Sequence, residues 1–222
     1  MTKGCLWLLF FASTWQVFSG ELQIQPESTF AVITHKAGLL SSLGHNHFIY
    51  AGDYDGSLMI EGEDPQSLKF QFSVPVAALM VDDPAAAKKW YPELEKAAVV
   101  DEAFSEVSEK DRGKITKSML SKKQLHGDKF PTIEASIDAV KEKSGKVGDL
   151  ETTHVLTLKL KIRDASQTIP VPAAVKIEDG TWHIRAVAAM KFSDFNIKPF
   201  SAMLGSVAND DQFHLFVDMI AK

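Results

Sequence analysis

Apolar and polar side chains alternate along most of this sequence, and that alternation limits the fold more than any other feature. It is strongest in Val155–Arg163, where Leu156, Leu158, Leu160 and Ile162 alternate with Thr157, Lys159, Lys161 and Arg163. Successive side chains of an extended strand point to opposite faces, so this segment has one dry face and one wet face. Half-buried strands of this kind are typical of antiparallel sheets.

The same two-residue period predicts strands along the rest of the chain. They lie at Thr29–His35, His47–Ile60, Ser67–Val76, Thr132–Ala139, Thr181–Met190 and Gln212–Ala221. Turn signals separate them, for example Glu178-Asp179-Gly180, and no helix alternates with them, which excludes a doubly wound α/β fold. We predict an all-β domain in which at least seven strands, and by preference eight, form an extended antiparallel, lipocalin-like barrel.

One segment, Asp82–Lys129, breaks the alternation. It is rich in Ala, Glu and Lys, and Asp83-Pro84 supplies a helix cap followed by a first-turn proline. We therefore predict a helical insert that caps one end of the barrel. Its basic residues have two interpretations, a solvated helix face or a surface for anionic lipid headgroups. They are Lys110, Arg112, Lys114, Lys117, Lys122 and Lys123.

The first 20 residues have the order of a secretory signal peptide. Lys3 precedes an apolar run from Cys5 to Ala12, and the small residues Ser19 and Gly20 follow. The predicted cleavage lies after Ser19 or after Gly20, and residues 21–222 then form a single domain. Cleavage would remove the only cysteine, so the mature chain would have no disulfide and no thiol nucleophile.

Charge and motifs exclude several classes of function. The formal net charge of −5 argues against binding to nucleic acid. The sequence contains neither the Gly-x-Ser-x-Gly motif of serine hydrolases nor a glycine-rich phosphate loop. These observations favour a binding protein over an enzyme.

Three histidines give an alternative interpretation. His45 and His47 are separated by one residue and would share a face of an extended segment, and His35 could join them from a neighbouring strand. Three imidazoles suit Zn²⁺ or Cu²⁺. The alternative is therefore a metalloprotein, or a metalloenzyme, that uses His35, His45 and His47.

Three stretches in this order and spacing resemble the YceI-like family of exported, lipocalin-like proteins. They are Ser28–His35 with Gly38 and Asp55–Leu58, then Met119-Leu120 with Lys129–Ile133, and then Ser193–Ile197. The resemblance runs from about residue 22 to residue 222. It implies a barrel that binds a polyisoprenoid or an isoprenoid quinone in the periplasm. The chain departs from the family pattern at Asn196, where glycine is usual, but asparagine also accepts a positive φ. The segment Asp83–Ser108 is longer than is usual in the family, so we expect the mouth of the pocket to differ.

The sequence therefore predicts a non-enzymatic carrier of an apolar isoprenoid lipid, with no required cofactor. The residues expected to face the ligand are Phe30, Val32, Phe70, Phe72, Leu156, Leu158, Trp182 and Ile184. The same alternation would also fill a solid core, so a hollow interior is a hypothesis at this point. A third interpretation is an envelope adaptor that acts through its helical insert. Transient membrane contact and a homodimer both remain open.

Overall fold

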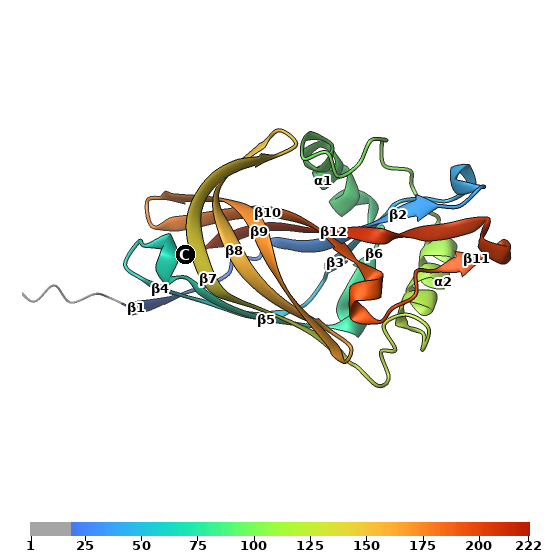
Figure 1. The fold of residues 1–222 in the computed structure, drawn as a ribbon, viewed down its shortest axis with the longest axis horizontal. Coiled ribbons are helices and arrows are strands. Elements are labelled where there is room, and N and C mark those ends of the chain that lie inside the picture. Colours follow the sequence, from blue (N-terminus) through green and yellow to red (C-terminus); the bar gives the residue numbers. More distant parts are fainter. Residues whose placement is uncertain (1–18) are drawn as a thin grey trace, which may run out of the picture.

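The computed structural model describes residues 19–222, which form one curled antiparallel sheet with two α-helices (Figure 1). The predicted signal peptide lies almost wholly outside the described residues. The strands are β1 (Ser19–Leu22), β2 (Thr29–Ala37), β3 (His47–Ala51), β4 (Asp55–Glu61), β5 (Lys69–Pro75), β6 (Leu79–Val81), β7 (Thr132–Val147), β8 (Leu150–Ile162), β9 (Ala165–Glu178), β10 (Thr181–Lys191), β11 (Ser201–Ala202) and β12 (Val207–Ala221). The helices are α1 (Pro84–Lys96) and α2 (Glu109–Leu120), with short 3-10 turns η1 (Ser41–Leu43), η2 (Pro65–Ser67), η3 (Val76–Ala78), η4 (Phe192–Phe195) and η5 (Met203–Gly205).

The strand order explains how the sheet curls. It runs β1-β4-β5-β7-β8-β9-β10-β12-β2-β3-β6, and β11 pairs with β12. Although β3 and β4 lie far apart in this order, β3 continues into β4 through Gly52–Tyr54, and β5 continues into β6 through η3. One arm of a long hairpin is β3 followed by β4, and the other arm is β5 followed by β6. Because β4 pairs with β5 near one end of the strand order and β3 pairs with β6 at the other end, this bent hairpin joins the two ends of the sheet. The sheet therefore wraps round on itself.

The predicted count of eight strands is wrong, because the sheet has twelve. The predicted strand His47–Ile60 is broken by a bend into β3 and β4, and β1, β6, β9 and β11 were not among the predicted strands. The bend between β3 and β4 needs a glycine: Gly52 donates its N–H to the carbonyl of Ala78, and a Cβ at residue 52 would lie 3.0 Å from that carbonyl oxygen. On the partner strand, Pro75 has no N–H for the ladder, which favours the break at η3.

Helix α1 covers the outer face of the sheet and not the end of the barrel, which corrects the predicted cap. Asp83 caps its first turn by accepting the N–H of Ala86. Its apolar face packs on outward-facing residues of β2, β3, β10 and β12, and this second core contains Ala31, Ile33, Phe48, Ala87, Trp90, Tyr91, Leu94, Val187 and Phe216. Arg185 of β10 fixes the helix to the sheet, because its guanidinium contacts Glu93 of α1 at 2.8 Å and Asp218 of β12 at 2.6 Å.

Helix α2 alone lies at an end of the curled sheet, near β6 and β11 (Figure 1). Ser108 caps it by accepting the N–H of Asp111. The chain between the helices is not helical, since it turns at Ala98, where φ is 54°, and buries Val99, Val100 and Val107. The predicted continuous insert is therefore two separate helices with different roles, and only α2 is placed to cover an opening.

The bend after η4 bears out one expectation. Asn196 ends this turn in the left-handed conformation, with φ of 56° and ψ of 29°. Asparagine adopts this conformation more easily than most residues other than glycine. The substitution of the usual glycine therefore leaves the backbone path possible.

Candidate functional site

An apolar cavity of about 360 Å³ lies inside the curl of the sheet. Its wall comes from the inward faces of the strands, because the alternation described above sends their apolar side chains to one side. The volume is at the lower end of the range of about 300–1,000 Å³ that is usual for small-molecule sites. The wall includes Phe30, Val32, Phe70, Phe72, Ile133, Ile137, Leu156, Leu158, Leu160, Ile162, Val171, Ile184, Phe213, Leu215, Val217 and Met219.

Seven of the eight residues predicted to face a ligand line this cavity. They are Phe30, Val32, Phe70, Phe72, Leu156, Leu158 and Ile184. Trp182 belongs to the same core but is not part of the lining. It stands two residues before Ile184 in β10, opposite Ala221 near the C-terminus, and only 1% of its surface is exposed. Trp182 thus fills the core beyond the cavity. Contact of these residues with a ligand stays a prediction.

Aromatic rings are concentrated on one side of the cavity. The ring of Phe30 lies 4.5 Å from that of Phe72 and 6.1 Å from that of Phe70, measured between centroids. Tyr54 adds an edge-to-face contact with Phe30 at 5.0 Å. Such rings are rigid and offer large apolar surface. The neighbouring strand β12 contributes Phe213, Leu215, Val217 and Met219 to the wall, and these residues were not among those predicted to face the ligand, although the alternation of the predicted strand places them on one face.

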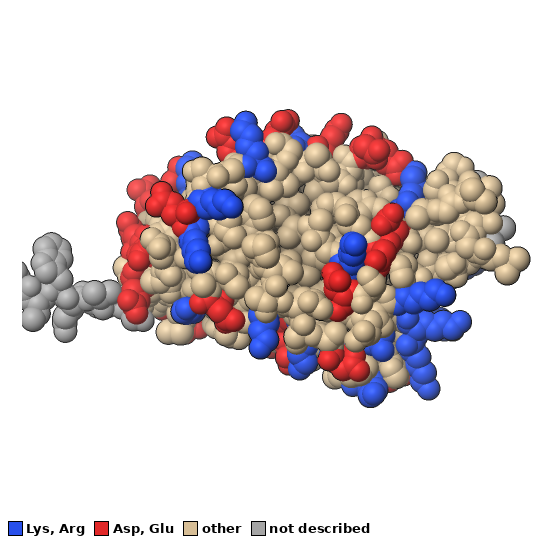
Figure 2. Space-filling model, viewed as in Figure 1, with Lys and Arg blue, Asp and Glu red and all other residues tan. Residues whose placement is uncertain are grey.

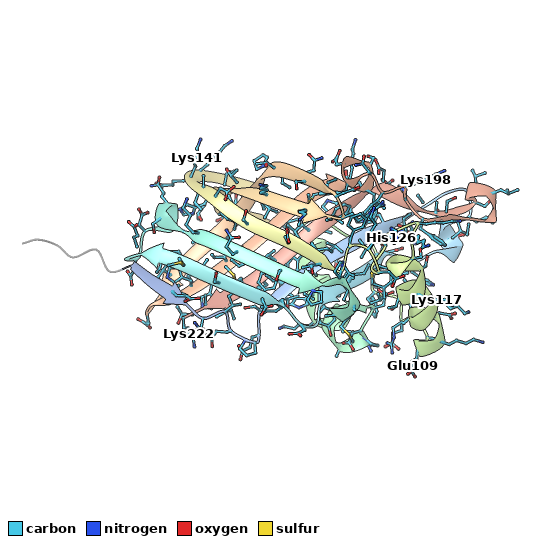
Figure 3. All side chains as sticks on the ribbon, turned by 90° about the horizontal axis from the view of Figure 1, so that it is seen from below. Glu109, Lys117, His126, Lys141, Lys198 and Lys222 are labelled. Atoms are coloured by element: carbon cyan, nitrogen blue, oxygen red, sulfur yellow. The ribbon has the colours of Figure 1, made fainter. Side chains whose placement is uncertain are left out.

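The mouth of the cavity lies at the end covered by α2. Figure 3 shows α2 at the end of the molecule opposite Lys222, with Glu109 and Lys117 directed outward. Ile115 and Met119 of α2 line the cavity, together with Phe200 and Asn209 of the β11–β12 region. Phe200 is 38% exposed. The cavity therefore reaches the surface between α2 and β11.

Six of the lining residues are polar: Thr34, His47, Lys114, Ser118, Gln124 and Asn209. Thr34 of β2 and His47 of β3 are directly paired across the two strands, and both line the cavity. His47 Nδ1 lies 2.7 Å from Oδ2 of Asp82, a carboxylate with no exposed surface. The other oxygen of Asp82 accepts the N–H of Phe48 at 2.8 Å. Asp82 thus holds the imidazole of His47 in a fixed orientation. Because the two residues are 35 positions apart in the chain, no local sequence pattern predicts this contact.

The predicted three-histidine face is wrong. Thr34, not His35, shares the face of His47, so His35 points to the other side of the sheet. There its Nε2 lies 2.7 Å from Nδ1 of His214. His45 is exposed and precedes β3, which begins only at His47, so these two histidines do not share a strand face. Among residues 19–222 no group of three His, Cys, Asp or Glu side chains is arranged to hold a metal ion.

The His35–His214 pair is instead a partly buried contact on the outer face. Burial and, to a lesser extent, the neighbouring His35 lower the pKa of His214 to about 4. Burial also lowers the pKa of His35, although Asp210 and Asp101 oppose this effect. Both imidazoles are therefore neutral near pH 7.

None of the helices in the described part of the chain is both long and apolar enough to cross a membrane.

A curled antiparallel sheet around an apolar cavity defines a class of protein that binds small apolar molecules in its interior. The chain belongs to the YceI-like family, since the family's YceI-like domain matches residues 22–219. This family is one of binding proteins.

Solved structures share the fold at low sequence identity. BcnA from Burkholderia cenocepacia is similar with a TM-score of 0.62 and 13% identity, over 90% of this chain and 100% of that one. A polyisoprenoid binding domain from Saccharophagus degradans is similar with a TM-score of 0.52 and 6% identity, over 93% of this chain and 99% of that one. No curated protein matches the sequence.

Proposed function

We propose that this protein carries or stores an apolar lipid of isoprenoid type in the cavity of its sheet, outside the cytoplasm after export. The apolar cavity of about 360 Å³ is the observation that supports this proposal most strongly. Its wall offers aromatic and branched aliphatic groups and few polar ones, so recognition rests on the burial of hydrocarbon. The likeness to a polyisoprenoid binding domain adds support for this class of ligand.

The energetics of such binding are favourable. Burying one methylene group contributes about 0.8 kcal/mol, so a five-carbon isoprene unit contributes about 4 kcal/mol before the entropic cost of association is subtracted. Two or three units inside the cavity would therefore suffice for binding.

Native mass spectrometry tests this proposal. The protein is expressed with its leader in a bacterial host and purified from the periplasmic fraction without detergent. We expect a population with an added mass, and extraction should identify that mass as an isoprenoid lipid. Protein that has only its own mass and takes up no added isoprenoid would contradict the proposal, and retention of the chain in the cytoplasm would contradict export.

The surface around the mouth supports a transient contact with a membrane. Beyond the mouth, the two neighbouring loops that contain η1 and η5 expose Leu39, Leu40, Phe200 and Leu204. Leu39 is 95% exposed, which is unusual for leucine. Figure 2 shows basic side chains beside this uncharged tip, where α2 lies in Figure 1. We propose that the leucines insert among lipids while lysines of α2 face anionic headgroups, so that the ligand enters directly from the bilayer.

Sedimentation with vesicles that contain anionic phospholipid tests this contact. The double substitution Leu39→Asp with Leu204→Asp should abolish cosedimentation, because it places charge where the apolar tip would insert. Met59→Asp is the matched control, since Met59 is 47% exposed but lies in β4. Equal binding by the wild type and both variants would overturn the proposed contact.

A further inference from the structure

Thr34 has an environment that the protein fold alone does not explain. Only 4% of its surface is exposed, and its hydroxyl oxygen has no hydrogen-bond partner among the described residues. A buried hydroxyl without a partner costs about 1–3 kcal/mol of stability, which valine would avoid at nearly the same size. The hydroxyl belongs to a residue of the cavity lining, so a bound molecule can reach it.

His47 is the polar neighbour of Thr34. The two residues are cross-strand partners on one face, which places their Cβ atoms about 5 Å apart. The carboxylate of Asp82 accepts a hydrogen bond from Nδ1–H of His47, and in this tautomer Nε2 is a hydrogen-bond acceptor. Thr34 then offers a donor and His47 an acceptor on neighbouring strands of a mostly apolar cavity.

Asp82 is built into the fold so that it holds this arrangement. Its own N–H is donated to the carbonyl of Phe48 at 2.8 Å, its carboxylate accepts the N–H of Phe48, and its φ is 49°. This left-handed conformation is unfavourable for most residues that carry a side chain, so the surrounding hydrogen bonds must maintain it. The imidazole is therefore oriented before any ligand arrives.

We infer that Thr34 and His47 form a binding site for the hydroxyl head group of an apolar ligand whose hydrocarbon chain occupies the cavity. A hydroxyl matches both partners, because it donates to Nε2 of His47 and accepts from Thr34, whereas a carbonyl can use only Thr34. Beside His47 an anionic head group is disfavoured by the buried Asp82 carboxylate, which lies directly behind the imidazole, whereas Lys114 of α2, which also lines the cavity, acts in the opposite direction.

The positions of the residues also give the ligand an orientation. Along β2 the inward side chains run from Phe30 through Val32 to Thr34, and β2 ends near the exposed tip. Thr34 is therefore nearest the mouth and Phe30 is deepest. The hydrocarbon chain enters first, and the hydroxyl remains beside α2.

This inference rests on the proposed function, and the test separates the two. Farnesol, its hydrocarbon counterpart farnesene and farnesyl pyrophosphate compete with the fluorescent apolar probe N-phenylnaphthylamine for the purified full-length mature protein. The wild type should bind farnesol about tenfold more tightly than farnesene, as expected for two hydrogen bonds of ordinary net strength, and should bind the pyrophosphate more weakly than farnesol.

Thr34→Val is the decisive variant, because it keeps the shape and breaks no hydrogen bond within the described protein. It should reduce the preference for farnesol to about threefold or less and leave the affinity for farnesene within twofold of wild type. His47→Asn should have the same effect, since asparagine can still donate to Asp82 but has no atom in place of Nε2. Thr157→Val, the same change at a residue of β8 outside the lining, is the control that should keep the full preference.

The outcomes distinguish the two proposals. If wild-type protein binds neither farnesol nor farnesene, the proposed function fails. If it binds both equally, or if Thr34→Val keeps the preference or weakens farnesene and farnesol alike, the function stands and the head-group site is refuted. Tighter binding of the pyrophosphate than of farnesol would also refute it.

Discussion

A larger side chain that fills the cavity should stabilise the protein, whereas the same larger side chain at a packed position outside the cavity should not. Ala186 of β10 lines the cavity, and Ala173 of β9 lies directly opposite it but outside the lining. Both alanines are buried. Leucine at either position adds the same three carbon atoms to the same sheet. The two substitutions therefore differ only in whether empty space lies next to the new side chain.

The magnitudes follow from this difference. At about 0.8 kcal/mol for each buried carbon group, Ala186→Leu should gain about 2 kcal/mol, or about 5 °C in Tm for a domain of this size. Ala173→Leu has no such space, and overpacking should cost about 1–3 kcal/mol. The substitution at Ala186 should also weaken binding of an isoprenoid by about thirtyfold, because it occupies the volume that three ligand carbons would fill.

Urea denaturation of the ligand-free proteins, followed by tryptophan fluorescence, measures both changes. The sign of the change at Ala186 is the critical result. If Ala186→Leu loses stability as Ala173→Leu does, the interior is packed solid at this position and the reasoning about a ligand cavity is wrong.

Three further predictions concern single contacts. Thr29→Val should lower the free energy of unfolding by about 1–3 kcal/mol, because the buried indole N–H of Trp90 loses the hydroxyl oxygen that accepts its hydrogen bond at 3.1 Å. Thr34→Val in the same strand should cause no loss in the same denaturation experiment, because the hydroxyl of Thr34 has no partner among the described residues. The free energy of unfolding should fall as the pH decreases from 6.5 towards about 4, because the pKa of His214 is lower in the folded protein than its unfolded value of 6.5, so the unfolded chain takes up the proton first. His214→Gln should flatten this part of the pH profile. An unchanged slope in this variant would contradict the assignment to His214. Asn196→Ala should cost about 1 kcal/mol through its left-handed backbone and Asn196→Gly should not, and equal thermal denaturation midpoints for the two variants would argue against that conformation.

Strands with one apolar face could be predicted from the sequence because their alternation follows directly from strand geometry. β9 is the main exception, since Pro170 and Pro172 interrupt its pattern and normally argue against a strand. The structure explains them: β9 pairs with β10 only from Ala173 onward, so both prolines lie where only β8 is a hydrogen-bonded neighbour. No sequence pattern reveals that two neighbouring strands will separate there.

The candidate site could be predicted only where it depends on a single strand. Seven lining residues follow from alternation, but a hollow interior depends on how several strands curl, and Trp182 shows that an inward residue can lie beyond the cavity. The prediction of a three-histidine metal site failed for a related reason. A spacing of two residues places His45 and His47 on one face only if both lie in the strand, and β3 begins at His47. The contact between His47 and Asp82 arises from the pairing of β3 with β6.

A crystal structure of the protein incubated with farnesol tests the central claim most directly. We expect continuous ligand density inside the sheet, between Phe30, Phe72 and Ile184, with its polar end towards Thr34 and His47. Side chains that close this space, or ligand density found only on the outer surface, would contradict it.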